Sequence, residues 1–136
     1  MVVPVPKGGE RVQIIPDEIV AAELRHGGVT EPVINYLLAL SPLERETELE
    51  RISVVVLAIE SAIIHVQGNL RMWQNDDHHI CQQIDSIDPS IRTEMIRLYE
   101  LEIAALEVLD PIVATEEDVV SISTTFHEQI EGLSSH

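Results

Sequence analysis

Apolar residues recur at alternating spacings of three and four along the stretch from Ser41 to Asn75. This heptad pattern predicts one long helix with an apolar edge that packs against a partner helix. Ser41 and Pro42 form a helix-start signal, and no further proline occurs before Pro89. We interpret the residues of this seam as interface residues: Leu49, Ile52, Val56, Ile59, Ile63, Val66, Leu70 and Trp73.

A second apolar row widens the stripe on this helix and consists of Val55, Ala58 and Ala62. Since one partner helix does not cover so wide a stripe, we expect the helix to pack on more than one side. Two arrangements would complete the core: a homodimer that pairs the long helices, or N-terminal helices that fold back as a cover. Gly68 marks an expected bend or end, because glycine inside a helix costs about 1 kcal/mol.

Start and stop signals predict two further long helices. Proline after aspartate at Pro89 and Pro111 bounds the first of them, and Thr115 with Asp118 forms a capping box that opens the second. The chain is therefore predicted to be an all-α bundle with long helices at about 42–75, 89–109 and 116–130. The short connections between them favour antiparallel neighbours.

Short helices are predicted before and between the long ones, at 16–25, at 31–40 with Thr30 as its cap, and at 76–87 after a cap at 75–77. The last of these is expected to turn Ile80, Ile84 and Ile87 inward. We assign residues 16–136 to a single helical domain, since the chain is long enough for one buried core.

The first fifteen residues read as an extended N-terminal arm. Pro4 and Pro6 favour an extended backbone, and the apolar Val3 and Val5 are expected to lie on the bundle or on a neighbouring subunit. The arm lacks the basic and continuous apolar regions of a signal peptide. We therefore expect a location in the cytoplasm or inside a virion.

The charge balance argues against nucleic acid as a partner. Twenty-four acidic residues oppose eight basic ones, for a net charge of −16. A nucleic-acid binder needs clustered lysine and arginine to neutralise phosphates, and an anionic membrane surface makes the same demand. The acidity favours solubility, attraction to a basic protein, or DNA mimicry. The apolar run Val54–Ile59 is too short to span a membrane.

Cys81 is the only cysteine, so no intramolecular disulfide is possible. His78 lies one helical turn before it, and the two side chains could supply half of a zinc site. The other half would have to come from a second copy. Otherwise the thiol is expected to be buried and inert.

Two carboxylates, Glu60 and Glu102, fall among apolar residues on their predicted helices. A buried charge is costly unless it is paired, so each needs a partner. Glu23 and His26 have the spacing that carboxylate-bridged dimetal bundles use. These four residues form our hypothetical divalent-metal site. The alternative is that both glutamates flank their helices or form ion pairs with arginines, namely Arg71, Arg92 or Arg97.

Neither a glycine-rich phosphate loop nor a nucleophile–histidine signature occurs in the sequence, so no catalytic residue is assigned. We expect a non-enzymatic, homo-oligomeric helical bundle that acts in assembly or protein–protein interaction, as a structural subunit, an adaptor or an acidic chaperone-like binder. One alternative is a metal-dependent enzyme with a carboxylate and histidine site in the bundle core. The other is an acidic DNA mimic or an inhibitor of a basic protein.

Overall fold

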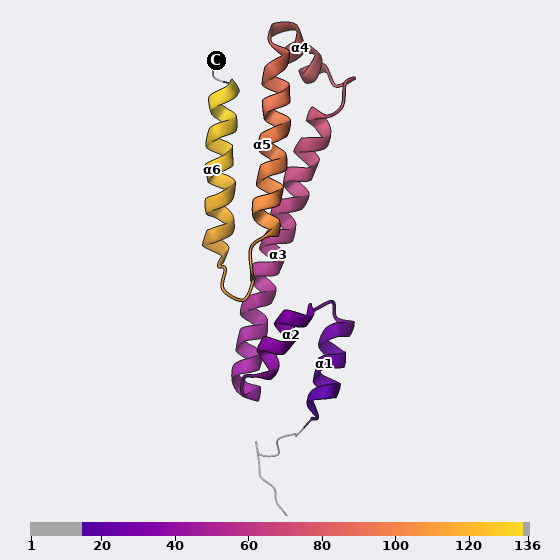
Figure 1. Cartoon of the computed structure of the whole chain (residues 1–136), viewed down its shortest axis with the longest axis vertical. Coiled ribbons are helices and arrows are strands. Elements are labelled where there is room, and N and C mark those ends of the chain that lie inside the picture. Colours follow the sequence, from indigo (N-terminus) through magenta and orange to yellow (C-terminus); the bar gives the residue numbers. More distant parts are fainter. Residues whose placement is uncertain (1–14, 135–136) are drawn as a thin grey trace, which may run out of the picture. The chain divides into compact units, whose positions relative to one another are not determined.

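The computed structural model describes residues 15–134, and every regular element within this range is a helix. The helices are α1 (Asp17–His26), α2 (Glu31–Leu38), α3 (Pro42–Trp73), α4 (His79–Ile87), α5 (Pro89–Glu107) and α6 (Glu116–Ser134) (Figure 1). The predicted all-α class and the three long helices are confirmed. The predicted arm lies outside the described residues, apart from Ile15.

The chain divides between Leu49 and Glu50 into two compact units. The first holds α1, α2 and the start of α3, and the second holds the rest of α3 with α4, α5 and α6. Helix α3 is continuous through the division and through Gly68, where a bend or end was expected. No helix within residues 15–134 has both the length and the apolarity that a membrane span requires.

In the first unit, α2 is tied to the start of α3 by side chains of α3. Tyr36 Oη donates a hydrogen bond to Glu48 Oε1 at 2.7 Å. The Arg45 guanidinium donates to carbonyl oxygens at the end of α2, at 3.0 Å to Leu37, 3.5 Å to Leu38 and 3.1 Å to Leu40. These bonds satisfy carbonyl groups that a helix end leaves unpaired.

Local signals at the helix starts are partly confirmed. Ser41 caps α3, because its Oγ accepts from the Glu44 amide at 3.3 Å and Glu44 bonds back to the Ser41 amide. Thr30 precedes α2 without a side-chain cap. Pro32 in the first turn explains part of this difference, since proline removes an amide that a threonine hydroxyl would cap.

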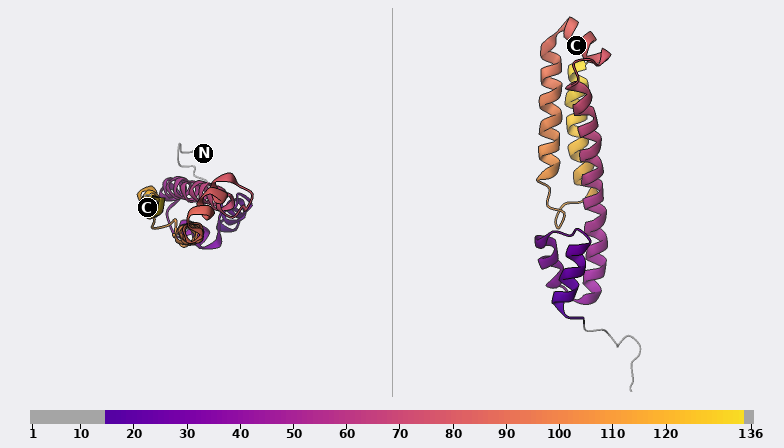
Figure 2. Two further views of the ribbon diagram at one scale, coloured as in Figure 1. Left: turned by 90° about the horizontal axis from the view of Figure 1, so that it is seen from above. Right: turned by 90° about the vertical axis from the view of Figure 1, so that its right-hand side faces the viewer.

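The second unit is an antiparallel arrangement of α3, α5 and α6. The views in Figures 1 and 2 agree that these three helices run side by side, with successive helices reversed in direction. The loop between α5 and α6 favours this order for the last two helices, and α4 forms the connection between α3 and α5. The core combines residues from all three helices and from the loop before α6: Val55, Ile59, Val66, Leu106, Ala114 and Val119.

At the end of α3, a second cluster of Trp73, Cys81 and Met95 packs α4 against α3 and α5. Cys81 is fully buried, as predicted, and its thiol donates to the Met72 carbonyl oxygen at 3.2 Å. Arg92 donates to the Trp73 carbonyl oxygen at 2.7 Å and so joins α5 to the end of α3.

The start of α4 differs from the prediction. The helix begins at His79, because His78 Nδ1 accepts the Ile80 amide at 3.2 Å and caps it. Asn75 instead forms a local turn with the Asp77 amide. Ile80 and Ile87 are exposed, at 36% and 77%, against the prediction that both face inward, whereas Ile84 packs against the Trp73 cluster.

Candidate functional site

Glu102 of α5 is the charged side chain that the fold buries within residues 15–134, with 5% of its surface exposed. In this part of the chain its carboxylate has no hydrogen bond or ion pair. Two of the arginines considered as partners are engaged elsewhere, Arg92 with Asp76 and Asp85, and Arg97 with Glu94. An unpaired buried carboxylate is unfavourable for folding, so it calls for a functional explanation.

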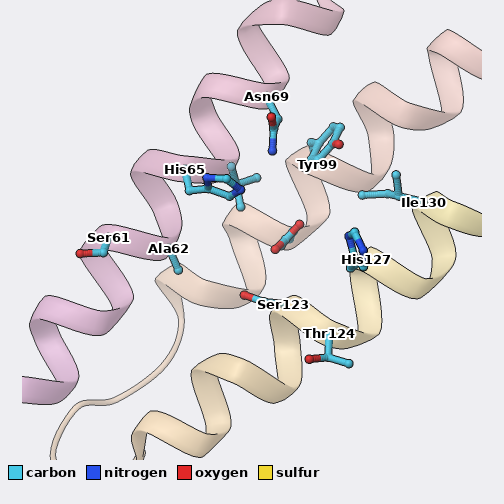
Figure 3. Close-up of a pocket in the computed structure, with 11 residues that line it drawn as sticks. Ser61, Ala62, His65, Asn69, Tyr99, Ser123, Thr124, His127 and Ile130 are labelled. Carbon is cyan, nitrogen blue, oxygen red and sulfur yellow. The ribbon is translucent and has the colours of Figure 1, made fainter.

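A groove with a volume of about 530 Å³ opens over Glu102 between α3, α5 and α6. Figure 3 shows His65 and His127 entering it from α3 and α6. The rim is accessible to solvent, since 69% of the His127 side chain is exposed. The polar groups of the lining, besides Glu102, are Ser61, His65, Asn69, Tyr99, Ser123, Thr124 and His127.

The electrostatics of the groove centre on Glu102. Burial raises the pKa of its carboxyl above the usual range, and positive charge on His65 or His127 opposes this rise. Burial also raises the pKa of the Tyr99 phenol, against a hydrogen bond from Trp73, and the nearby Glu102 charge adds to the rise. The groove therefore disfavours negative charge and would be stabilised by a cation.

The four residues of the hypothetical metal site differ in their burial and belong to two different compact units. Glu23 and His26 are exposed in α1 of the first unit, and Glu60 is exposed on α3 and does not line the groove. Only Glu102 is buried. Among the described side chains, no group of three histidines, cysteines or acids is placed to hold a metal ion. The divalent-metal site stays a prediction.

The half-site suggested by His78 and Cys81 is used by the fold. His78 caps α4 through Nδ1, and its ring stacks on His79 with centroids 4.7 Å apart. The Cys81 thiol is buried against backbone carbonyl groups. The two side chains therefore do not form an exposed pair of metal ligands on one face of α4.

The predicted seam of α3 lies in the interior. Its residues Ile52, Ile59, Val66 and Trp73 are buried, and the others are half-buried. Ile59 and Val66 pack in the core with residues of α5 and α6. Within the second unit the chain's own helices thus take the place that a partner helix was expected to fill.

The opposite side of α3 carries a second heptad-spaced row, which we call the outer seam: Val54, Leu57, Ser61, Ile64 and Gly68. Its three large residues are exposed: Val54 by 43%, Leu57 by 64% and Ile64 by 65%. At 3.6 residues per turn, the row lies roughly half a turn around the helix from Ile59 and Val66. Ser61 belongs both to the outer seam and to the rim of the groove.

Most of the groove was missed at the level of sequence, although a signal for it exists. Ser61, His65 and Asn69 recur every four residues and therefore share one face of α3. Ser123 and His127 repeat that spacing on α6. Two polar rows at helical spacing, each beside an apolar row, predict a polar groove only when the helices are known to be neighbours.

Comparison with known proteins gives no family for this chain, since no protein-family model matches it and no similar curated protein or solved structure was found.

Proposed function

We propose that the protein acts as a homo-oligomeric helical bundle in assembly or protein–protein interaction, and that a second copy packs on the outer seam of α3. The observation that carries this proposal is the spacing of Val54, Leu57, Ser61, Ile64 and Gly68, three and four residues apart on the exposed side of a long helix. A seam with this period is complementary to another helix with the same period.

The best match for the outer seam is the same helix of another copy. In a twofold pair one surface meets itself, so each side chain of the seam packs against side chains of the same seam. An antiparallel pairing about Ser61 sets Ser61 against itself and Val54 against Gly68, so the two backbones can approach there, while Leu57 meets Ile64. In an antiparallel pair, Glu50 at one end comes close to Arg71 of the other copy, whereas a parallel pair would place like charges together. Charge therefore favours an antiparallel dimer.

The energetics predict a weak, concentration-dependent dimer. Full burial of a valine, leucine or isoleucine side chain contributes about 1.5–3 kcal/mol. Since these side chains are already partly covered, each contributes roughly 1–2 kcal/mol. Six of them give about 6–12 kcal/mol, against an association cost of about 4–15 kcal/mol. The two ranges overlap, so we expect association at high protein concentration and dissociation on dilution.

Light scattering after size-exclusion chromatography, over a range of concentrations, tests the dimer. Leu57→Glu places two like charges in the proposed contact, and we expect this variant to stay monomeric. Val120→Glu is the matched control, since Val120 of α6 is 63% exposed and Leu57 is 64% exposed. A wild-type protein that is monomeric at every concentration, or a dimer that persists in Leu57→Glu, would contradict the proposal.

The net charge of −16 supports a basic protein as a further partner of the assembly. The lone cysteine, which excludes an intramolecular disulfide, supports action in the cytoplasm or inside a virion.

A further inference from the structure

We propose that the groove over Glu102 binds a small organic cation, a primary alkylamine, with its ammonium group against the Glu102 carboxylate. This inference goes beyond the proposed dimer and does not depend on it. It starts from one fact about the fold, which buries a carboxylate to 5% exposure and forms no hydrogen bond or ion pair with it within residues 15–134, where the charged groups that act on it are His65 and His127.

The composition of the groove selects for positive charge. Its lining contains the Glu102 carboxylate and neither lysine nor arginine. An ammonium ion entering the groove would pair with that carboxylate where solvent screening is weak. An anionic ligand would meet the Glu102 charge and the net charge of −16, and His65 and His127 are the side chains of the lining that could carry positive charge.

The remaining side chains suit an alkylammonium group. An ammonium head has three N–H donors, of which Glu102 satisfies one or two. Asn69, Ser123 and Thr124 bring neutral oxygen acceptors to the same groove from α3 and α6 (Figure 3). The alkyl chain finds apolar surface in the same lining, from Ala62, Val66 and Ile130.

A divalent metal fits the described side chains less well. Glu102, His65 and His127 come from three different helices, and no three candidate ligands among the described residues form a metal-binding group. In addition, His127 Nε2 lies 3.2 Å from Glu131 Oε2, so that nitrogen is directed to a neighbour on α6. An ammonium ion needs only one carboxylate and neutral acceptors, which the groove has.

Isothermal titration calorimetry with n-butylamine tests the proposal on the full chain at pH 7.5 and about 0.15 M salt, which screens binding to scattered surface acids. We expect saturable binding of one n-butylamine per chain. Glu102→Gln should weaken it at least tenfold. Glu100→Gln removes the same charge from an exposed position on the same helix and should leave the affinity within twofold. The neutral n-butanol should not bind.

A second variant keeps Glu102 and closes the groove. Thr124 is exposed at the rim, so Thr124→Trp can add bulk without disturbing the core, and it should also abolish n-butylamine binding. Equal affinity in wild type and Glu102→Gln, or no saturable binding by the wild type at millimolar n-butylamine, overturns the proposal. Zinc binding that requires Glu102 and excludes n-butylamine would overturn it in favour of a metal site.

Discussion

The two sides of α3 in the second unit carry the same heptad spacing and end up in opposite environments. On one side, Ile59 and Val66 pack into the core against α5 and α6. On the other, Leu57 and Ile64 are 64% and 65% exposed. A difference between them is size, because the inner row is large throughout, whereas the outer row alternates large residues with Ser61 and Gly68.

This contrast shows what periodicity determines and what it leaves open. A row of apolar residues three and four apart indicates that one face of a helix packs against another element. Whether that cover comes from the same chain or from another depends on which helices the connections bring alongside. The inner row is covered because the segment that contains α4 returns α5 to it, and the loop between α5 and α6 returns α6. The outer row remains for a partner.

The largest expected effect comes from placing the same charge on each side of α3. Val66 is 3% exposed, so Val66→Asp buries an unpaired carboxylate in the core. Substitutions of this kind destabilise by about 4 kcal/mol or more. Ile64→Asp adds the same charge on the exposed side and should stay within about 0.5 kcal/mol of wild type. Urea unfolding followed by circular dichroism measures both.

That measurement should be made at low protein concentration, so that dissociation of a dimer does not enter the unfolding free energy. Equal destabilisation by Val66→Asp and Ile64→Asp would break the comparison, because it would mean that the outer row is as buried in solution as the inner one. If both substitutions changed the unfolding free energy only slightly, neither row would be buried in a core.

Much of the fold could be predicted from local signals that act within one turn of helix. The Ser41 cap and the Thr115–Asp118 capping box are both present, with Asp118 Oδ2 accepting from the Thr115 amide at 2.8 Å. Such signals depend only on neighbouring residues, and they placed the long helices to within a few residues. The start of α4 differs from the prediction because His78 caps the helix, whereas Asn75 accepts from the Asp77 amide in a local turn.

The site could not be predicted because it depends on which helices become neighbours. Glu60 and Glu102 looked equivalent in the sequence, each flanked by apolar residues one turn away. Glu102 faces the groove between three helices and is buried, whereas Glu60 lies on the solvent side of α3. Glu60 and Glu102 differ in burial because each helix is rotated differently about its own axis. When a helix is apolar on two sides, the spacing of the flanking residues does not determine that rotation.

A second prediction compares a buried with an exposed charge, and it concerns the effect of Glu102→Gln and Glu60→Gln on stability. Because burial raises the pKa of Glu102, the folded protein binds its proton more tightly than the unfolded chain does. Its contribution to stability is complete below the unfolded pKa and is lost as pH rises through the folded pKa. At pH 7, Glu102→Gln should therefore stabilise the protein by about 1–3 kcal/mol, the usual penalty of an unsatisfied buried group.

The stabilisation by Glu102→Gln should shrink as pH falls through the raised pKa, since the wild-type carboxyl then becomes neutral as well. Denaturant unfolding at pH 7 and at pH 4.5 supplies the two free energies. Glu60→Gln is the control at an exposed position and should change stability by less than about 0.5 kcal/mol at either pH. A destabilised Glu102→Gln at pH 7 would show that the ionised carboxylate has a favourable partner in the folded protein.

The smallest expected effect concerns Gly68 and separates the two roles of the outer seam. Gly68 lies inside α3, and a Cβ added there meets no atom within 4 Å. Gly68→Ala should therefore stabilise the monomer by about 0.5–1 kcal/mol through helix propensity alone. If Gly68 allows a second helix to approach closely, the added methyl group should at the same time weaken the dimer. Thermal unfolding at low concentration measures the first effect, and light scattering at high concentration measures the second. A variant that is both more stable and more strongly dimeric would show that the contact does not require a small residue at this position.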